Sequence, residues 1–185
     1  MPAMSTDRSV LNFQIRTAPV TSEGVNVPSC RAIFTSLSPT PIGHTGKRYR
    51  PIAPDSVLAF GDAMASRTGG TLTYSNLDDG HKSLVFCTLK DPLNISKGKP
   101  AMKQLCLVAP NDGDGSLTVA ALINDLWCDN QHHVVVGRGR RREVITRIRI
   151  RHTDTADALV REATSILDRI LPAIVREETT LAALL

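Results

Sequence analysis

The stretch Arg138-Gly-Arg-Arg-Arg-Glu-Val-Ile-Thr-Arg-Ile-Arg-Ile-Arg151 decides the fold that we predict for this chain. It holds seven arginines and a single acidic residue, Glu143, within fourteen positions. Its second half alternates between charge and branched apolar side chains, in the order Arg147, Ile148, Arg149, Ile150 and Arg151. A period of two places alternate side chains on opposite faces of a β-strand. We therefore predict a strand with one cationic face and one apolar face, although Gly137 and Gly139 allow a bulge that would change where the earlier arginines point.

The segment that follows this strand has the pattern of an amphipathic helix. Asp154-Thr-Ala-Asp157 supplies a capping side chain and acidic residues for the first turn. Apolar residues then recur at steps of three and four: Leu159, Ala163, Ile166, Leu167 and Ile170. Pro172 is expected to interrupt this helix, and residues 173–184 would form a second one. We thus predict that residues 155–184 form two C-terminal helices covering the isoleucine face.

Short strand candidates fill most of the remaining sequence. Residues 10–15 and 30–34 flank a turn at 22–24, which predicts an N-terminal hairpin. Three later candidates follow one another across turn-forming residues: 71–74, 83–90 and 102–108. Residues 117–127 suit a short helix or a strand equally well. The fold class that we expect is α+β, with an N-terminal β-hairpin, an antiparallel β-sheet meander and two C-terminal α-helices.

Length and composition indicate one domain spanning residues 1–185. The proline-rich residues 36–56 are expected to be a long loop or an arm. The four cysteines are far apart and no N-terminal apolar segment resembles a signal peptide. We therefore expect a protein that is synthesised in a reducing cytosol and whose cysteines are free thiols. No run approaches the ~20 apolar residues needed to span a bilayer. The formal net charge of +4 is modest, so its local concentration matters more than its total.

The clustered arginines predict a polyanionic partner. One alternative is an edge strand that uses charge only to avoid aggregation, but one or two charges are enough for that purpose. Seven neighbouring guanidinium groups repel one another and favour phosphate contacts. Because the chain has few aromatic residues, we expect contacts to phosphate and sugar rather than base stacking.

No pattern in the sequence indicates a metal, a cofactor or catalysis. Cys128, His132 and His133 lie close together, but a structural zinc site needs four ligands and no fourth is nearby. The glycines near Gly137 lack the spacing and setting of a dinucleotide-binding turn. No sequence around a serine or histidine organises a nucleophile. We therefore expect a protein that is not an enzyme and binds no metal or cofactor.

The strand order and the C-terminal residues resemble the coat proteins of single-stranded RNA bacteriophages, the levivirus type. Residues 147–167 are similar to that family's last strand, its helix start and the apolar pattern of its first helix. Ser83–Lys90 and Lys103–Pro110 are similar to the central hairpin of the coat sheet.

The resemblance implies a structural capsid protein. Subunits would form homodimers in which each subunit's helices pack on the partner subunit's sheet, and dimers would assemble into an icosahedral shell around the RNA genome. The virion would assemble in the bacterial host cytoplasm, without a membrane partner. Residues 111–133 would be a variable loop in which Cys128 forms an inter-subunit disulfide. By position and charge, the RNA-binding candidates are Thr88, Lys90, Lys103, Arg138, Arg140, Arg142, Arg147, Arg149 and Arg151.

A second interpretation explains the same arginines without a shell. The chain would then be a cellular RNA-binding module, associated with translation or the ribosome. The particle size of the purified protein separates the two hypotheses.

Overall fold

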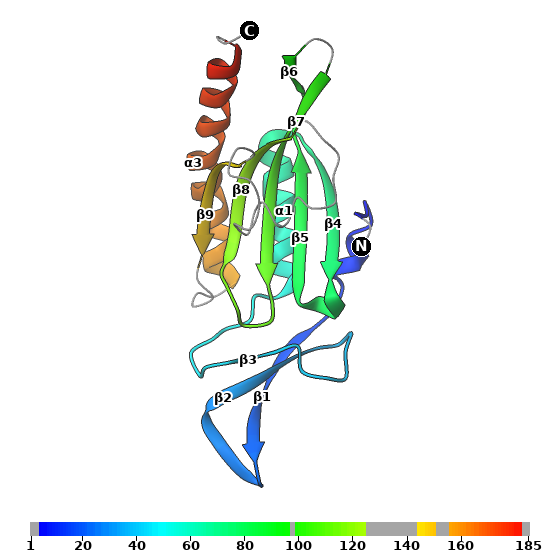
Figure 1. Cartoon of the computed structure of the whole chain (residues 1–185), viewed down its shortest axis with the longest axis vertical. Helices are drawn as coiled ribbons and strands as arrows, with labels where there is room; N and C mark the ends of the chain where they lie inside the picture. The colour runs from blue at the N-terminus through cyan, green and yellow to red at the C-terminus, as the bar shows by residue number, and fades with distance from the viewer. Residues whose placement is uncertain (1–3, 97–98, 125–143, 151–155, 183–185) are drawn as a thin grey trace.

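The computed structural model describes residues 4–96, 99–124, 144–150 and 156–182. Two antiparallel sheets are present in this part of the chain, a small one near the N-terminus and a larger one carrying two helices. Figure 1 shows the helices lying behind the larger sheet and the small sheet projecting from one of its ends. The α+β class predicted from the sequence is confirmed.

The N-terminal hairpin is confirmed and gains a third strand. β1 (Ile15–Ser22) pairs with β2 (Val25–Thr35), and β2 pairs with β3 (Gly43–Thr45). We call these three strands the N-terminal sheet. Glu23 and Gly24 form the two-residue turn with φ values of 51° and 80°. Two positive φ values in succession are the geometry that matches the twist of a tight hairpin, and glycine adopts it without a steric cost.

The first predicted strand begins later than the apolar pattern suggested. Val10 and Leu11 belong to the 3₁₀ helix η1 (Arg8–Leu11), and β1 starts only at Ile15. The carboxylate of Asp7 accepts a hydrogen bond of 2.8 Å from the backbone N–H of Ser9. This local cap favours a turn over a strand at the start of the segment.

The larger sheet is the predicted meander. Its strands lie in the order β4 (Thr71–Leu77), β5 (Lys82–Thr88), β7 (Lys99–Pro110), β8 (Leu117–Asn124) and β9 (Val144–Ile150). The short β6 (Leu93–Ser96) pairs with the beginning of β7. The ambiguous residues 117–127 therefore contribute a strand. That result also corrects the expectation of a variable loop over 111–133, because β8 lies inside those residues.

One helix was missed in the sequence. α1 (Pro54–Thr68) begins inside the proline-rich segment assigned to a loop or an arm. Pro54 stands at the start of the helix, where its missing N–H costs no hydrogen bond, and Gly69 ends it with φ of 65°. A β-carbon on Gly61 would lie 3.0 Å from a methyl group of Val85 on β5, so glycine lets the helix approach the sheet closely.

The C-terminal segment forms one helix instead of the predicted two. α3 (Ala156–Ala182) continues through Pro172, whose side chain is exposed. The buried Ile170 and Ile174 lie on either side of the proline at a helical spacing of four, so the apolar stripe continues in register. Packing of this stripe outweighs the hydrogen bond that a proline removes from a helix interior.

Both helices pack on the sheet of their own chain. α1 contacts β5 and β7, α3 contacts β8 and β9, and the two helices contact each other. The main core lies between them and includes Phe60, Leu105 and Leu167, each at most 1% exposed. The resemblance to coat proteins implied helices that pack on a partner subunit's sheet. The structure instead covers the apolar stripe of α3 within the chain.

The N-terminal sheet is attached to the turns at one end of the larger sheet. The hydroxyl of Thr35 donates to the backbone oxygen of Asp79 at 2.8 Å, beside the buried Gly80. On the β7–β8 turn, a β-carbon on Gly113 would lie 2.7 Å from the backbone oxygen of His44. The small sheet is therefore held at the end where β4 meets β5 and β7 meets β8.

Candidate nucleic-acid interface

The predicted division of faces is confirmed in the part of the arginine strand that the structure describes. Ile148 packs against the helix-covered core, and Ile150 is 6% exposed within it. Arg147 pairs in register with Ala120, and Arg149 with Thr118. Since register partners share a face, both arginines lie on the face opposite the helices, which we call the second face. The bulge predicted at Gly137 and Gly139 falls on residues outside the described part of the chain, while the pairing of β8 with β9 shifts register at another place, between Ala121 and Leu122.

Arg147 and Arg149 differ in their surroundings. Arg149 is exposed, whereas Arg147 is partly buried. Burial lowers the pKa of Arg147, and the neighbouring charge of Arg149 lowers it further. Both effects disfavour the guanidinium cation, so a negatively charged ligand at this position would relieve part of the electrostatic cost. Arginine stays protonated at neutral pH in any case.

Most of the second face is apolar rather than cationic. A buried cluster occupies its centre, formed by Leu77, Leu84, Phe86, Cys106, Val108, Ala120 and Leu122. Thr118 and Ser75 on the same face are also buried. Among the described residues, the cations that we place on this face are Arg147 and Arg149 on β9 and Lys82 at the start of β5, whose register partner Leu77 belongs to the cluster. The described part of this face is therefore basic only at its two sides, with an apolar centre.

The three candidates on or beside the central hairpin lie in different places. Thr88 is on the second face and accepts a hydrogen bond of 3.1 Å from the side-chain amide of Gln104. Lys90 is exposed just after β5. Lys103 lies on the helix-covered face, where its ammonium group forms an ion pair with Glu178 of α3. The structure thus separates Lys103 from Arg147 and Arg149, because alternation within β7 turns it toward the helices.

Several candidates lie outside the described residues. These are Arg138, Arg140, Arg142, Arg151 and Cys128. His132 and His133, considered with Cys128 as metal ligands, lie there too. Their proposed roles stay predictions.

A second basic feature was missed in the sequence. Residues 15–50 carry five basic side chains and one acidic residue, Glu23. The difference of four equals the formal net charge of the whole chain, which is +4, so the rest of the sequence is formally neutral. We call residues 15–50 the N-terminal basic segment. Its basic residues are Arg16, Arg31, Lys47, Arg48 and Arg50.

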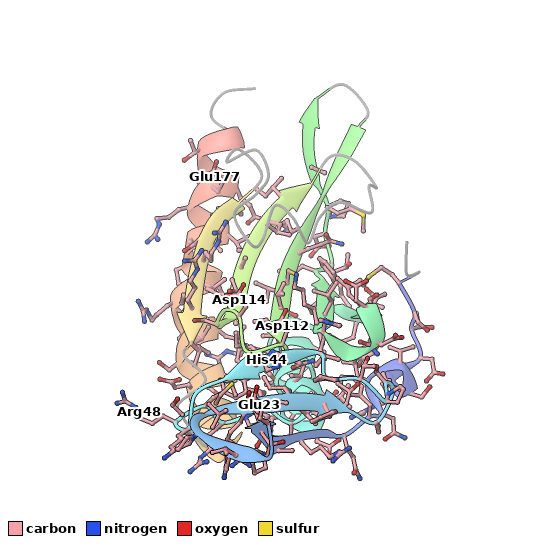
Figure 2. The ribbon with its side chains drawn as sticks, turned by 60° about the horizontal axis from the view of Figure 1, so that its bottom comes forward. Glu23, His44, Arg48, Asp112, Asp114 and Glu177 are labelled. Atoms are coloured by element: carbon pink, nitrogen blue, oxygen red, sulfur yellow. The ribbon has the colours of Figure 1, made fainter. Side chains whose placement is uncertain are left out.

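The cations of this segment are accessible and form no ion pair with a carboxylate of the described residues. Arg16, Lys47, Arg48 and Arg50 are exposed, and Arg31 is partly buried. None of the ion pairs between described residues involves them. Figure 2 brings the N-terminal sheet to the front, with His44 labelled on β3 and Arg48 on the segment that follows it. The sequence signal was weak because these residues are spread over β1, β2 and the segment before α1, with no dense run.

The two basic features lie at the same end of the molecule. Ile150 at the end of β9 pairs with Leu117, the first residue of β8. The turn before Leu117 contacts the backbone of His44 in the N-terminal sheet. Figure 1 shows β9 ending near the side from which the N-terminal sheet projects. The end of β9, which carries Arg149, therefore lies at the same end of the larger sheet as the N-terminal basic segment.

The remaining features of the described residues concern metal ligands, membrane spans and cysteines. No group of three potential metal ligands occurs among them. No helix in this part of the chain has both the length and the apolar character required to cross a bilayer. Cys87 and Cys106 are buried, and burial raises the pKa of both thiols. Cys30 is partly exposed on β2.

Comparison with known proteins gives one result. A family model described as "Domain of unknown function (DUF932)" matches residues 41–184, well over half of the chain. The searches of curated proteins and of solved structures found no match to the chain. The family match corrects the resemblance to levivirus coat proteins. That resemblance rested on the order of strands and helices and on short apolar patterns, which unrelated α+β proteins can share.

Proposed function

This chain belongs to the DUF932 family, a domain of unknown function, and we propose from its own residues that it binds single-stranded RNA by the phosphates. Residues 15–50 hold a formal charge equal to that of the entire chain, and four of the five basic side chains are exposed. None of the five forms an ion pair with a described residue. This concentration of unbalanced charge is the observation that carries the proposal. When such a surface binds an extended polyanion, the basic side chains neutralise phosphates. The counterions released from the polyanion then favour binding.

The arginine strand supports the same function from the neighbouring end of the sheet. Arg149 is exposed on the second face, and the partly buried Arg147 lies two residues before it. Guanidinium groups bind phosphate oxygens through paired N–H donors. An RNA strand crossing the N-terminal sheet could reach Arg149 without leaving this end of the molecule. The proposed activity is binding alone, and assembly into a shell is not part of it.

The type of contact follows from the residues available. Phenylalanine, tyrosine and tryptophan together make up 4% of the chain. Phe13 and Phe86 are buried in the cores, and the ring of Phe34 lies under the guanidinium of Arg16 at 4.8 Å. Few aromatic surfaces are therefore free to stack on bases. Binding through phosphates predicts little dependence on base sequence.

The first prediction concerns salt. We expect a fluorescein-labelled single-stranded RNA to bind, with the logarithm of the association constant falling by about 3 to 4 for each unit in log salt if about five phosphates are neutralised. Fluorescence anisotropy over a series of KCl concentrations measures the slope. A DNA strand of the same sequence carries the same phosphates and should show a similar slope.

Two controls make this experiment decisive. A peptide nucleic acid of the same base sequence has no phosphates and should not bind. The double substitutions R16Q/R50Q and R169Q/R176Q remove equal charge from the N-terminal basic segment and from α3, and only the first should lower the slope. A flat salt response, or equal losses in both variants, would contradict the proposed function.

A further inference from the structure

The N-terminal sheet contains a groove that the charge argument above does not use. Its cavity volume is about 460 Å³, and β1, β2 and the segment between β3 and α1 line it. Arg31, Lys47 and Arg50 supply three cations to the lining. None of the described residues that line it is acidic. A concave site with three positive charges and no negative charge favours an anionic ligand.

Arg31 is held in a fixed position. Its Nε–H donates to the hydroxyl of Thr17 at 3.0 Å, and its Nη2 donates to the backbone oxygen of Thr17 at 3.1 Å. A guanidinium has five N–H donors, so three remain for a ligand. Anchoring to β1 removes much of the conformational freedom that the side chain would otherwise lose on binding.

The other two cations, Lys47 and Arg50, have no partner in the part of the chain that the structure describes. Among the described residues, Lys47 and Arg50 take part in no hydrogen bond or ion pair. Both belong to the segment between β3 and α1 and line the groove. Three like charges around one cavity repel one another, and a bound anion would remove that repulsion.

The size and the neutral part of the lining indicate more than a bare ion. Asn26 and Thr17 contribute polar groups, and Val27 and Pro28 contribute an apolar wall. The volume falls within the range of about 300–1,000 Å³ found for small-molecule sites. A phosphate with an attached sugar fits this combination of cations, polar groups and apolar wall.

We propose that this groove is a discrete site for one phosphate of a nucleotide unit, with Arg31 as the oriented donor and Lys47 and Arg50 as the remaining cations. The inference rests on the proposed function because it takes the nucleotide to belong to an RNA strand. It goes further because it assigns one phosphate to a groove with named contact residues, whereas the proposed function needs only a positively charged surface. Arg48, which does not line the groove, would contribute charge only.

Cys30 offers a reporter for occupancy because it lines the groove. We expect inorganic pyrophosphate at about ten times its dissociation constant to slow the alkylation of Cys30 by iodoacetamide about tenfold, because only the unoccupied fraction of the protein would still react. Peptide mass spectrometry follows the rate. Cys87 and Cys106 are buried and serve as internal controls for global unfolding.

A matched pair of substitutions tests whether the anion binds in the groove or is attracted only by the overall positive charge of the surface. R50Q should abolish the protection of Cys30, whereas R48Q, which removes the same charge two residues away, should retain it. R31K should also lose protection, because lysine keeps the charge but lacks the fork of donors. Equal loss in R50Q and R48Q, or no protection by pyrophosphate in the native chain, would overturn the inference.

The RNA measurement separates this inference from the proposed function. If native protein binds RNA and R50Q weakens it no more than R48Q does, the groove is wrong and the proposed function stands. If pyrophosphate protects Cys30 but RNA does not bind, the proposed function is wrong and the assignment of the groove to an RNA phosphate fails with it. Circular dichroism melting of each variant confirms that it is folded.

Discussion

Gly80 lies at a close contact between the two sheets. It follows β4, has φ of 97°, and a β-carbon there would lie 2.7 Å from a methyl group of Thr35 on β2. Two independent costs therefore oppose any side chain, an unfavourable backbone conformation and a steric conflict. We expect Gly80→Ala to lower the free energy of unfolding by about 2–3 kcal/mol, as measured by urea denaturation.

Gly24 provides the matched control for that substitution. Its φ of 80° is also positive, but no atom would lie within 4 Å of an added β-carbon. Gly24→Ala should therefore cost only the backbone term, about 1 kcal/mol. If both substitutions cost the same, the contact between Gly80 and Thr35 does not contribute to the attachment of the N-terminal sheet.

At the scale of elements, alternate residues of β9 lie on the two faces of the sheet, one packed in the core and the other facing the proposed ligand. Ile150 is 6% exposed in the main core, while Arg149 is exposed on the second face. Ile150→Ala should lower the free energy of unfolding by about 2–4 kcal/mol, and Arg149→Ala should change it by less than about 0.5 kcal/mol. Thermal unfolding measures both. A larger loss for Arg149→Ala than for Ile150→Ala would reverse the assignment of faces.

The elements that could be predicted from the sequence are those with a strong local pattern. Alternation located the arginine strand, and turn residues located the hairpin and the meander. α1 was missed because four prolines between 36 and 56 indicated a loop, although Pro54 and Gly69 stand where a helix begins and ends. The break expected at Pro172 did not occur, because tertiary packing of Ile170 and Ile174 outweighs the local preference. Local propensity cannot report such packing.

At the scale of the whole molecule, the position of charge was harder to predict than the fold. The arginine strand is dense in sequence, but it places only Arg147 and Arg149 on the second face among the described residues. The N-terminal basic segment has no dense run, yet folding gathers its cations into one small sheet and the segment after it. Strand order also proved too general to identify a family, since a meander followed by a helix is shared by many α+β folds.

The groove, the basic segment and Arg149 all predict that RNA contacts one end of the protein. RNA containing 4-thiouridine, cross-linked by ultraviolet light and mapped by mass spectrometry, tests this claim most directly. We expect the cross-linked peptides to come from residues 15–50 and from the end of β9. Cross-links confined to α1 and α3 on the opposite side of the sheet, or none above the level obtained in 1 M salt, would contradict the account.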